Sequence, residues 1–375
     1  MPLTVLAALS LAIWIYLIAF RARFWRMRPD APVHMLDQAA PAIYAVVPAR
    51  NEAPFVARAI SSLAAQIYPG DLTITLVDDH SDDGTASLAA AVAPHLHVIT
   101  ARPLPSGWTG KMWAVSEGVA AAGDADYILL TDADIVHHPQ NVASLVARAR
   151  AGNYDLASYM VRLHCGTLAE QALIPAFVFF FFLLYPPAWI RDPHRRTAGA
   201  AGGCILIRRD ALDRIGGIAR IKHELIDDCA LARAVKQSGG RVWLGLADRT
   251  VSIRPYTSFA EIGAMISRTA FTQLRHSWIL LAGTVAGLAV TYLAPPLLTL
   301  FAANRNASGM AALAWLLMTA AYLPAVRYYR INWFWAPMLP AIAVFYLGAT
   351  VHSAIATWRG QGGMWKGRAQ SATLQ

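Results

Sequence analysis

Two aspartates follow a strand-like run near the middle of the chain. The stretch YILLTDADIV spans residues 127–136 and places Asp132 and Asp134 directly after five apolar or hydroxyl residues. In an extended segment, residues two apart present their side chains on the same side. Two carboxylates near a phosphate suit Mg²⁺ or Mn²⁺, because such ions bind one or two carboxylates together with substrate phosphates. The pair predicts a metal site, and a turn capped by Asp134 is the alternative explanation.

Polar side chains also end two earlier strand-like runs. Asp78 and Asp79 end one of them, where a carboxylate can accept hydrogen bonds from a base N–H or a ribose hydroxyl. Arg50 and Glu52 follow the first run, and surface ion pairs are the alternative reading for both residues. The nearby Asp82 and Asp83 are expected to be turn and helix-cap residues.

A third set of candidates lies further along the chain. Asp227 and Asp228 precede a helical pattern, where one carboxylate could act as general base on an acceptor hydroxyl or simply cap the helix. Gly203 stands in the glycine-rich stretch AGAAGGCILIRR, which permits close backbone approach to a ligand or an ordinary turn. Cations in residues 268–278 could neutralise a leaving diphosphate or anchor the chain at a membrane interface.

The elements that must position these residues alternate along the first half of the chain. Short apolar runs alternating with amphipathic helices predict a parallel sheet in a doubly wound α/β fold. In such sheets, ligands bind at the carboxyl ends of the strands, near the point where strand order reverses. The expected strands are 43–49, 72–79, 96–100 and 127–134, and the expected helices are 54–66, 84–94, 111–122 and 139–150.

The composition indicates a membrane protein. Hydrophobic residues make up 56% and charged residues 15% of the 375 residues, which is too apolar for an ordinary soluble enzyme. Residues 2–20 are uncharged and long enough to span a bilayer. Four arginines follow in residues 21–28, an order opposite to that of a cleaved signal peptide. The positive-inside rule then places the following residues in the cytoplasm.

Further apolar segments occur later in the chain. Residues 279–302, 310–326 and 335–356 are expected to be spans. Three complete crossings would put the basic tail outside, so one of these segments is expected to be re-entrant or interfacial; a tail that breaks the positive-inside rule is the alternative. Residues 173–190 contain three prolines and four consecutive phenylalanines. They are expected to lie at the membrane interface, with a buried core helix as the alternative.

The net charge of +9 comes from arginines that flank apolar segments. This pattern favours attraction to anionic lipid headgroups and predicts no nucleic-acid partner. The three cysteines lack metal-ligand spacing and fit a reducing compartment. The expected organisation is an anchor at 1–20, a basic linker at 21–39, a cytoplasmic catalytic domain at 40–278, transmembrane helices at 279–358 and a basic tail at 359–375.

In order, the motifs VVPARNE, VDDHSDDGT, GWTGKMWA, TDAD, AGG, DD and QLRHSW resemble the membrane-integral branch of the family 2 glycosyltransferases. The resemblance covers roughly residues 40–280. It implies a GT-A fold, which is a Rossmann-like mixed α/β sheet, with N- and C-terminal transmembrane helices. The residues expected to contact a nucleotide sugar are Pro48, Arg50, Glu52, Asp78, Asp79, Lys111, Asp132, Gly203, Gln273, Arg275 and Trp278.

The resemblance also implies roles for the carboxylates. Asp132 and Asp134 correspond to the D-x-D pair that binds Mg²⁺ or Mn²⁺, and Asp228 corresponds to the catalytic base. Asp227 stands where the family usually has glutamate. The family motif Q-x-x-R-W has altered spacing here, which disfavours a channel-forming polysaccharide synthase. The stretches GWTGKMWA, LIDDCALA and RTAFTQLRHSW are most similar to the hopanoid-biosynthesis-associated group, and MWKGR resembles the tail motif of ceramide-glucosyltransferase-like members.

These observations predict a membrane-bound, inverting glycosyltransferase that uses a nucleotide-diphosphate sugar, with UDP as the expected nucleotide. The expected acceptor is a lipid, and the narrower resemblance implies a hopanoid. The expected location is the bacterial inner membrane, crossed several times, with the catalytic domain in the cytoplasm. A polysaccharide or oligosaccharide synthase is the enzymatic alternative. A nucleotide-sensing membrane scaffold is the alternative without catalysis.

Overall fold

The structure is a computed structural model that describes residues 1–31, 39–359, 364–365 and 368–369. The chain divides into two compact units, each with its own buried apolar interior. The helical unit comprises Met1–Arg28, Cys165–Ala188 and Pro255–Gly362. The sheet unit comprises Pro29–His164, Trp189–Arg254 and Gly363–Gln375.

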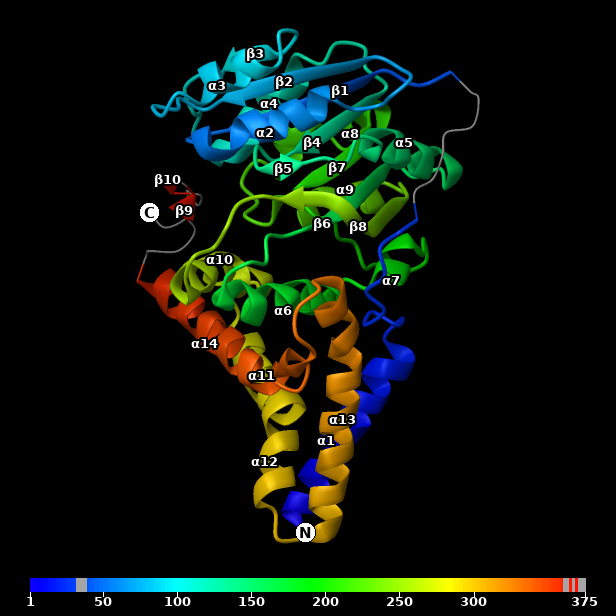
Figure 1. The fold of residues 1–375 in the computed structure, drawn as a ribbon, viewed down its shortest axis with the longest axis vertical. Helices are drawn as coiled ribbons and strands as arrows, with labels where there is room; N and C mark the ends of the chain where they lie inside the picture. Colours follow the sequence, from blue (N-terminus) through cyan, green and yellow to red (C-terminus); the bar gives the residue numbers. More distant parts are fainter. Residues whose placement is uncertain (32–38, 360–363, 366–367, 370–375) are drawn as a thin grey trace. The chain divides into compact units, whose positions relative to one another are not determined.

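An eight-stranded mixed sheet forms the sheet unit, with the strand order β3-β2-β1-β4-β7-β6-β8-β5 (Figure 1). The strands are β1 (Ile43–Ala49), β2 (Leu72–Asp78), β3 (His97–Thr100), β4 (Tyr127–Thr131), β5 (Ile135–Val136), β6 (Leu156–Arg162), β7 (Cys204–Arg208) and β8 (Val242–Ser252). The four expected strands are present, and they run parallel to one another. Beyond them, β7 runs antiparallel to both β4 and β6, which makes the sheet mixed.

The four helices expected in the first half of the chain are also present. They are α2 (Ala53–Ala64), α3 (Thr85–Val92), α4 (Gly110–Ala120) and α5 (Asn141–Ala151). The second half of the sheet unit adds α8 (Arg209–Arg214), the 3₁₀ helix η1 (Ile218–Ile221) and α9 (Asp227–Gln237). The short helix α7 spans Pro187–Arg191.

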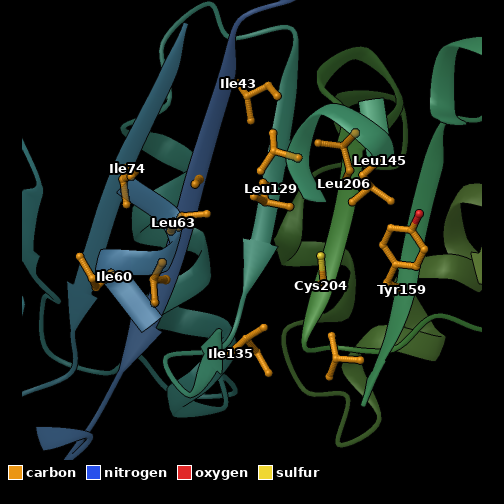
Figure 2. Packing of buried hydrophobic residues seen from close by; sticks show 14 of the residues in the cluster. Ile43, Ile60, Leu63, Ile74, Leu129, Ile135, Leu145, Tyr159, Cys204 and Leu206 are labelled. Atoms are coloured by element: carbon orange, nitrogen blue, oxygen red, sulfur yellow. The ribbon is translucent and has the colours of Figure 1, made fainter. Parts of the chain in front are cut away.

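Strand β1 is buried over its whole length, as expected for a parallel strand covered on both faces. On one face, Ile43 lies in a core that also contains Leu129 of β4 and Ile60 of α2 (Figure 2). On the other face, α4 packs very closely. A Cβ at Gly118 would collide with Val46 and lie 2.9 Å from Cγ2 of Val77, so glycine is required for this close packing.

The helical unit consists of helices from three separate segments of the chain. They are α1 (Pro2–Phe20), α6 (Leu168–Leu184), α10 (Phe259–Gln273), α11 (Trp278–Leu288), a π-helical segment (Ala289–Leu293), α12 (Ala294–Phe301), α13 (Arg305–Tyr328), the 3₁₀ helix η3 (Trp333–Trp335) and α14 (Leu339–Trp358). Helix α1 packs against α13 and α12 (Figure 1). The indole N–H of Trp14 donates a hydrogen bond to the carbonyl of Thr291, 2.8 Å away.

Five described segments are long and apolar enough to cross a membrane. They are Pro2–Phe20, Leu168–Arg191, Trp278–Phe301, Arg305–Tyr328 and Leu339–Trp358. Four of them coincide with the expected spans. The additional one contains the segment at 173–190 that we expected at an interface.

Helix α6 forms most of that additional segment. It begins with a capping box in which Thr167 and Glu170 satisfy each other's backbone N–H groups. Phe179 and Phe182 are buried, while Phe180 packs edge-on against Tyr292. One face of α6 is therefore part of the packed interior of the helical unit.

The predicted tail motif MWKGR is described only in part. Strands β9 (Met364–Trp365) and β10 (Arg368–Ala369) pair with each other in antiparallel fashion. Residues 366–367 lie outside the described part of the chain.

Candidate active site

A pocket opens where the carboxyl ends of β1 and β4 separate. The ladder between these strands ends at the pair Val46–Leu130, and Pro48, two residues further on, has no N–H to extend it. This point is also where strand order reverses, which is the usual ligand site of such sheets. The pocket is lined by Pro48, Lys111, Met112, Val115, Leu130, Thr131, Asp132, Gly202, Ile205, Ile218, Ile221, Asp227, Asp228 and Leu231.

Lys111 provides the positive charge of this pocket. It lies in the first turn of α4, which Thr109 caps by accepting the N–H of Met112. Its Nζ is 3.0 Å from Oδ1 of Asp132 and 3.4 Å from Oδ2 of Asp227. Burial alone would lower the pKa of Lys111, but the neighbouring carboxylates raise this pKa well above its usual value. The ammonium group therefore remains charged at any physiological pH.

Asp228 lies beside Lys111 and is held by the backbone. Its Oδ2 accepts the N–H of Gly202 at 2.9 Å, and its Oδ1 accepts the N–H of Cys229 at 2.7 Å. The N-cap position of α9 is occupied by Ile226, so the alternative capping role is wrong for Asp228. Burial and the charge of Asp227 raise the pKa of Asp228 to about 6. Such a carboxylate is suited to accepting a proton near neutral pH.

The pairing of β4 with β7 brings the glycine-rich stretch next to the D-A-D segment. Thr131 pairs with Cys204 across β4 and β7, and the hydroxyl of Thr131 donates to the carbonyl of Gly203 at 2.9 Å. A Cβ at Gly203 would lie 3.2 Å from side-chain atoms of both Ile135 and Val161. The absence of a side chain at Gly203 therefore makes room for Ile135 and Val161 and not for a ligand.

The D-A-D segment itself is a turn, so the expected extended conformation is wrong. Strand β4 ends at Thr131, and the N–H of Ile135 donates to the carbonyl of Asp132 at 3.2 Å. Asp132 points to Lys111, while Oδ2 of Asp134 accepts the hydroxyl of Ser252 at 2.9 Å. Burial raises the pKa of Asp132, Lys111 opposes the shift, and the charge of Asp134 adds to it. The two carboxylates are therefore close enough to interact.

An ion pair between Arg50 and Asp79 joins the loops after β1 and β2. Nη1 of Arg50 is 3.5 Å from Oδ2 of Asp79, and their side chains are 18% and 2% exposed. The alternative of a surface ion pair is therefore wrong for Arg50. Asp78 instead accepts hydrogen bonds from the hydroxyl and the N–H of Ser81, so its carboxylate stabilises its own turn.

Hydrogen bonds at the starts of α2 and α3 fix the position of Glu52. Its N–H donates to the hydroxyl of Thr85 at 2.8 Å, and the next N–H, of Ala53, donates to Oδ2 of Asp83 at 2.9 Å. Asp83 also accepts the N–H of Thr85, so its carboxylate binds an N–H group at the start of each of the two helices, although the N-cap position of α3 is occupied by Gly84. The carboxylate of Glu52 is nearly buried and forms an ion pair with Arg254. A surface ion pair is wrong for Glu52 as well.

Arg254 is the main site residue that sequence analysis missed. Its Nε donates to Oδ2 of Asp134 at 3.1 Å, while its other end binds Glu52. Arg254 follows β8, and β8 reaches the D-A-D turn through the pairing of Ser252 with Ile135. Only the position of β8 in the sheet could have revealed this proximity, because more than a hundred residues separate these segments.

His137 supports the D-A-D turn from inside the sheet unit and was also missed. Its ring nitrogens lie 2.9 Å from the hydroxyl of Thr131 and 3.0 Å from the amide nitrogen of Asn141. Complete burial lowers the pKa of His137 to about 4, so the ring is neutral at physiological pH. This uncharged network fixes the end of β4.

The remaining predicted residues belong to the helical unit. Gln273, Arg275 and Trp278 lie at the corner between α10 and α11, and all three are exposed. Gln273 exchanges hydrogen bonds with the hydroxyl of Tyr185, and Trp278 stacks on Trp358 with the ring centroids 3.5 Å apart. Cys165, Cys204 and Cys229 are free thiols.

The residues after β4 fit a divalent cation bound together with a ligand. Within the described ranges, no group of three or more His, Cys, Asp or Glu side chains could hold a metal ion. Asp132 and Asp134 nevertheless provide two interacting carboxylates at the mouth of the sheet. Mg²⁺ commonly binds one or two carboxylates and takes its remaining ligands from phosphates and water.

Comparison with known proteins gives the class of the sheet unit. Residues 44–216 match the sequence model of Glycosyl transferase family 2. The structure is similar to mannosyltransferase PcManGT from Pyrobaculum calidifontis, solved in complex with GDP-Man and Mn²⁺, with 20% identity and a TM-score of 0.55 over 94% of this chain and 98% of that chain. A glucosyl-3-phosphoglycerate synthase from Mycobacterium tuberculosis has 19% identity and a TM-score of 0.43 over 66% of this chain and 88% of that chain. No curated protein sequence matches the chain.

The family match and the fold agree with each other. The mixed α/β sheet has the GT-A fold, as expected, and residues 44–216, somewhat less than half of the chain, match the family 2 model. The family match over residues 44–216 supports the predicted glycosyltransferase activity.

Proposed function

We propose that this glycosyltransferase transfers a sugar, with inversion, from a nucleotide-diphosphate sugar to a hydroxyl group of a membrane lipid. The observation that carries the proposal is the pocket between β1 and β4. It combines a charged Lys111 with the backbone-held carboxylate of Asp228, whose pKa is near neutral. The GT-A fold shared with PcManGT, a protein solved with GDP-Man and Mn²⁺, supports a nucleotide-sugar donor.

Asp228 acts as the general base in this mechanism. Its backbone contacts hold the carboxylate in the pocket, where it takes the proton of the acceptor hydroxyl. The acceptor oxygen forms a bond to the anomeric carbon as the bond from that carbon to the diphosphate oxygen breaks. The electron pair of the broken bond leaves with the nucleoside diphosphate.

The leaving diphosphate gains negative charge, and Lys111 provides a fixed counter-charge. Its ammonium group is held between Asp132 and Asp227 and does not lose its proton. Asp132 and Asp134 would hold Mg²⁺ or Mn²⁺, and such an ion would supply Lewis-acid stabilisation of the leaving diphosphate. In this proposal the nucleotide part of the donor, which we propose to be UDP, contacts a wall formed by Pro48, Arg50 and Asp79.

The proposed base makes the reaction pH-dependent. The acid limb of kcat/KM should have its midpoint near pH 6, because protonated Asp228 cannot accept the proton of the acceptor. Asp227→Asn removes a neighbouring negative charge, which should lower the pKa of Asp228 and move this limb to lower pH. A pH series of initial rates with both proteins provides the measurement. If the acid limb of kcat/KM had the same midpoint in Asp227→Asn as in the wild type, a group other than Asp228 would be responsible for it.

The helical unit supports a membrane location and a lipid acceptor. Its helices α1, α11 and α12 expose large apolar side chains such as Ile279, Leu300 and Phe301, whose contact with water would be unfavourable. The arginines that follow α1 favour a cytoplasmic sheet unit in a bacterial inner membrane. A hopanoid is the narrower acceptor that we propose from the motif resemblance.

The phenylalanines of α6 allow a test of lipid use. Phe181 is partly exposed and contacts Tyr185, whereas Phe182 is buried. Phe181→Ser should weaken the use of a lipid acceptor and leave hydrolysis of the donor by water nearly intact. Phe182→Ser should reduce folding and both activities together, because it removes buried apolar area. Equal effects of the two substitutions on transfer and hydrolysis would assign α6 a purely structural role.

The proposed function can be tested directly. Purified protein in lipid vesicles should release nucleoside diphosphate from a sugar donor faster when an acceptor lipid is present, and UDP- and GDP-linked sugars should be compared. Lipid profiles of cells with and without the gene should differ by a glycolipid. Release of a polymer would instead support a synthase, and an absence of turnover with all donors would support a scaffold.

A further inference from the structure

Three consecutive residues at the end of β8 each form a hydrogen bond with Asp134. The hydroxyl of Ser252 donates to Oδ2 of Asp134 at 2.9 Å, and Nε of Arg254 donates to the same oxygen at 3.1 Å. Between them, the N–H of Ile253 donates to the main-chain carbonyl of Asp134 at 2.9 Å. Residues two apart in an extended segment lie on the same side, so the side chains of Ser252 and Arg254 can reach one atom. Both the main chain and the carboxylate of Asp134 are therefore held by this segment.

These contacts distinguish the two oxygens of the Asp134 carboxylate. Both side-chain donors bind Oδ2, and no residue in the described part of the chain donates a hydrogen bond to Oδ1 or forms an ion pair with it. Each carboxylate oxygen has its own lone pairs, so Oδ1 can bind a cation while Oδ2 accepts its two hydrogen bonds. Because the carboxylate is planar, fixing Oδ2 also fixes the direction in which Oδ1 points.

The charge of Arg254 is shared between two carboxylates. Its guanidinium group also forms an ion pair with Glu52, which arginine can do because it presents several N–H donors in a planar fork. With both carboxylates ionised, the side chains of Glu52, Asp134 and Arg254 carry one net negative charge. The guanidinium group also lies over the ring of Phe55, 4.7 Å from its centroid, which restricts its movement. Arg254 can therefore hold Asp134 without cancelling the negative charge that attracts a cation.

We infer that Arg254 is a positioning residue for Asp134: together with Ser252 it fixes Oδ2, so that Asp134 presents Oδ1 to the divalent cation. The inference rests on the proposed metal site. Residues that hydrogen-bond to a metal-binding carboxylate orient it, and their substitution typically lowers metal affinity about 10- to 100-fold. The role requires both the donors and the shape of the arginine side chain.

A role of Arg254 through its charge alone would have the opposite effect. A fixed positive charge close to a metal site repels the bound cation, so removing that charge would strengthen metal binding. If Arg254 acts by orienting Asp134, its removal weakens metal binding instead. The sign of the change in affinity therefore decides between the two roles.

This sign can be measured without any sugar transfer. The electron paramagnetic resonance signal of free Mn²⁺ gives a dissociation constant for each purified full-length variant without donor. Arg254→Met, which keeps a long side chain but has no donor, should bind Mn²⁺ about tenfold or more weakly than the wild type. Arg254→Lys keeps one donating group and should recover part of this loss. Ser252→Ala removes the other donor to Oδ2 and should weaken binding by a smaller factor. The matched control is Arg249→Met, at an arginine of β8 whose side chain is 72% exposed, and it should leave Mn²⁺ affinity unchanged.

Thermal melting shows which variants fold. If Arg254→Met does not fold, Ser252→Ala and Glu52→Gln test the inference with Arg254 in place. Glu52→Gln removes the carboxylate that anchors the other end of Arg254 and takes away the net negative charge, so it should also weaken Mn²⁺ binding. Wild-type Mn²⁺ affinity in both of these variants would contradict the positioning role.

Two further outcomes would overturn the inference. One is unchanged or tighter Mn²⁺ binding by Arg254→Met, and the other is weaker binding by Arg254→Lys than by Arg254→Met, which would show that charge repulsion dominates. Asp134→Asn then separates the inference from the proposed metal site. If that variant loses Mn²⁺ binding, the metal site stands without a positioning role for Arg254. If it binds Mn²⁺ like the wild type, the metal site is wrong as well.

Discussion

Asp228→Asn is expected to lower the rate of sugar transfer by about 10²-fold or more, the usual range for loss of a general base. The side chain keeps its size but loses its basicity. Donor binding should change little, because both carboxylate oxygens of Asp228 accept backbone N–H groups, from Gly202 and Cys229. Single-turnover transfer with saturating donor, together with an independent measurement of donor affinity, distinguishes the two effects.

The structure adds a cost that the sequence did not suggest. Asp228 accepts one N–H with each carboxylate oxygen, and asparagine has only one oxygen. Asp228→Asn should therefore also destabilise the sheet unit by about 1–3 kcal/mol, the cost of leaving one buried N–H without an acceptor. Thermal melting of the variant shows whether lost activity reflects lost folding.

Asp227→Asn is the matched control for this experiment. Asp227 is adjacent in sequence and ion-paired to Lys111, but its carboxylate does not hold the backbone of the glycine-rich stretch. Its substitution should affect transfer much less than that of Asp228. If Asp227→Asn were the more harmful change, the assignment of the base within the pair would be wrong.

Much of the sheet unit could be predicted from the sequence because its signals are local. Strands such as Tyr127–Thr131 are short apolar runs bounded by polar residues, and helices such as Ala53–Ala64 have one apolar face. Parallel strands place their carboxyl ends at one edge, so Pro48, Lys111 and Asp132 could be expected to share a pocket.

The remaining features of the site depend on contacts between residues that are far apart in the sequence. The position of Arg254 follows from the pairing of β8 with β5, which are more than a hundred residues apart in the sequence. The neutral state of His137 depends on burial, which its neighbours in sequence do not reveal. The turn at Asp132 was misread because a strand-like pattern does not show that the ladder of β4 ends at Thr131.

Asp134→Ala is expected to abolish metal-dependent donor binding while the protein still folds. The substitution removes one of the two carboxylates proposed to hold the ion. Arg254 keeps Glu52 as a partner, so no buried cation is left without a counter-charge. Donor affinity should be measured with Mn²⁺ and after removal of the ion with EDTA.

In the wild type, EDTA should weaken donor binding and stop transfer, whereas Asp134→Ala should bind donor weakly with or without Mn²⁺. A matched control is Asp83→Ala, which changes a carboxylate that only serves two helix starts. That variant should lose stability and retain its response to Mn²⁺. Full transfer by the wild type in EDTA would instead exclude a metal role, and Lys111 would then have to neutralise the leaving diphosphate without the help of a metal ion.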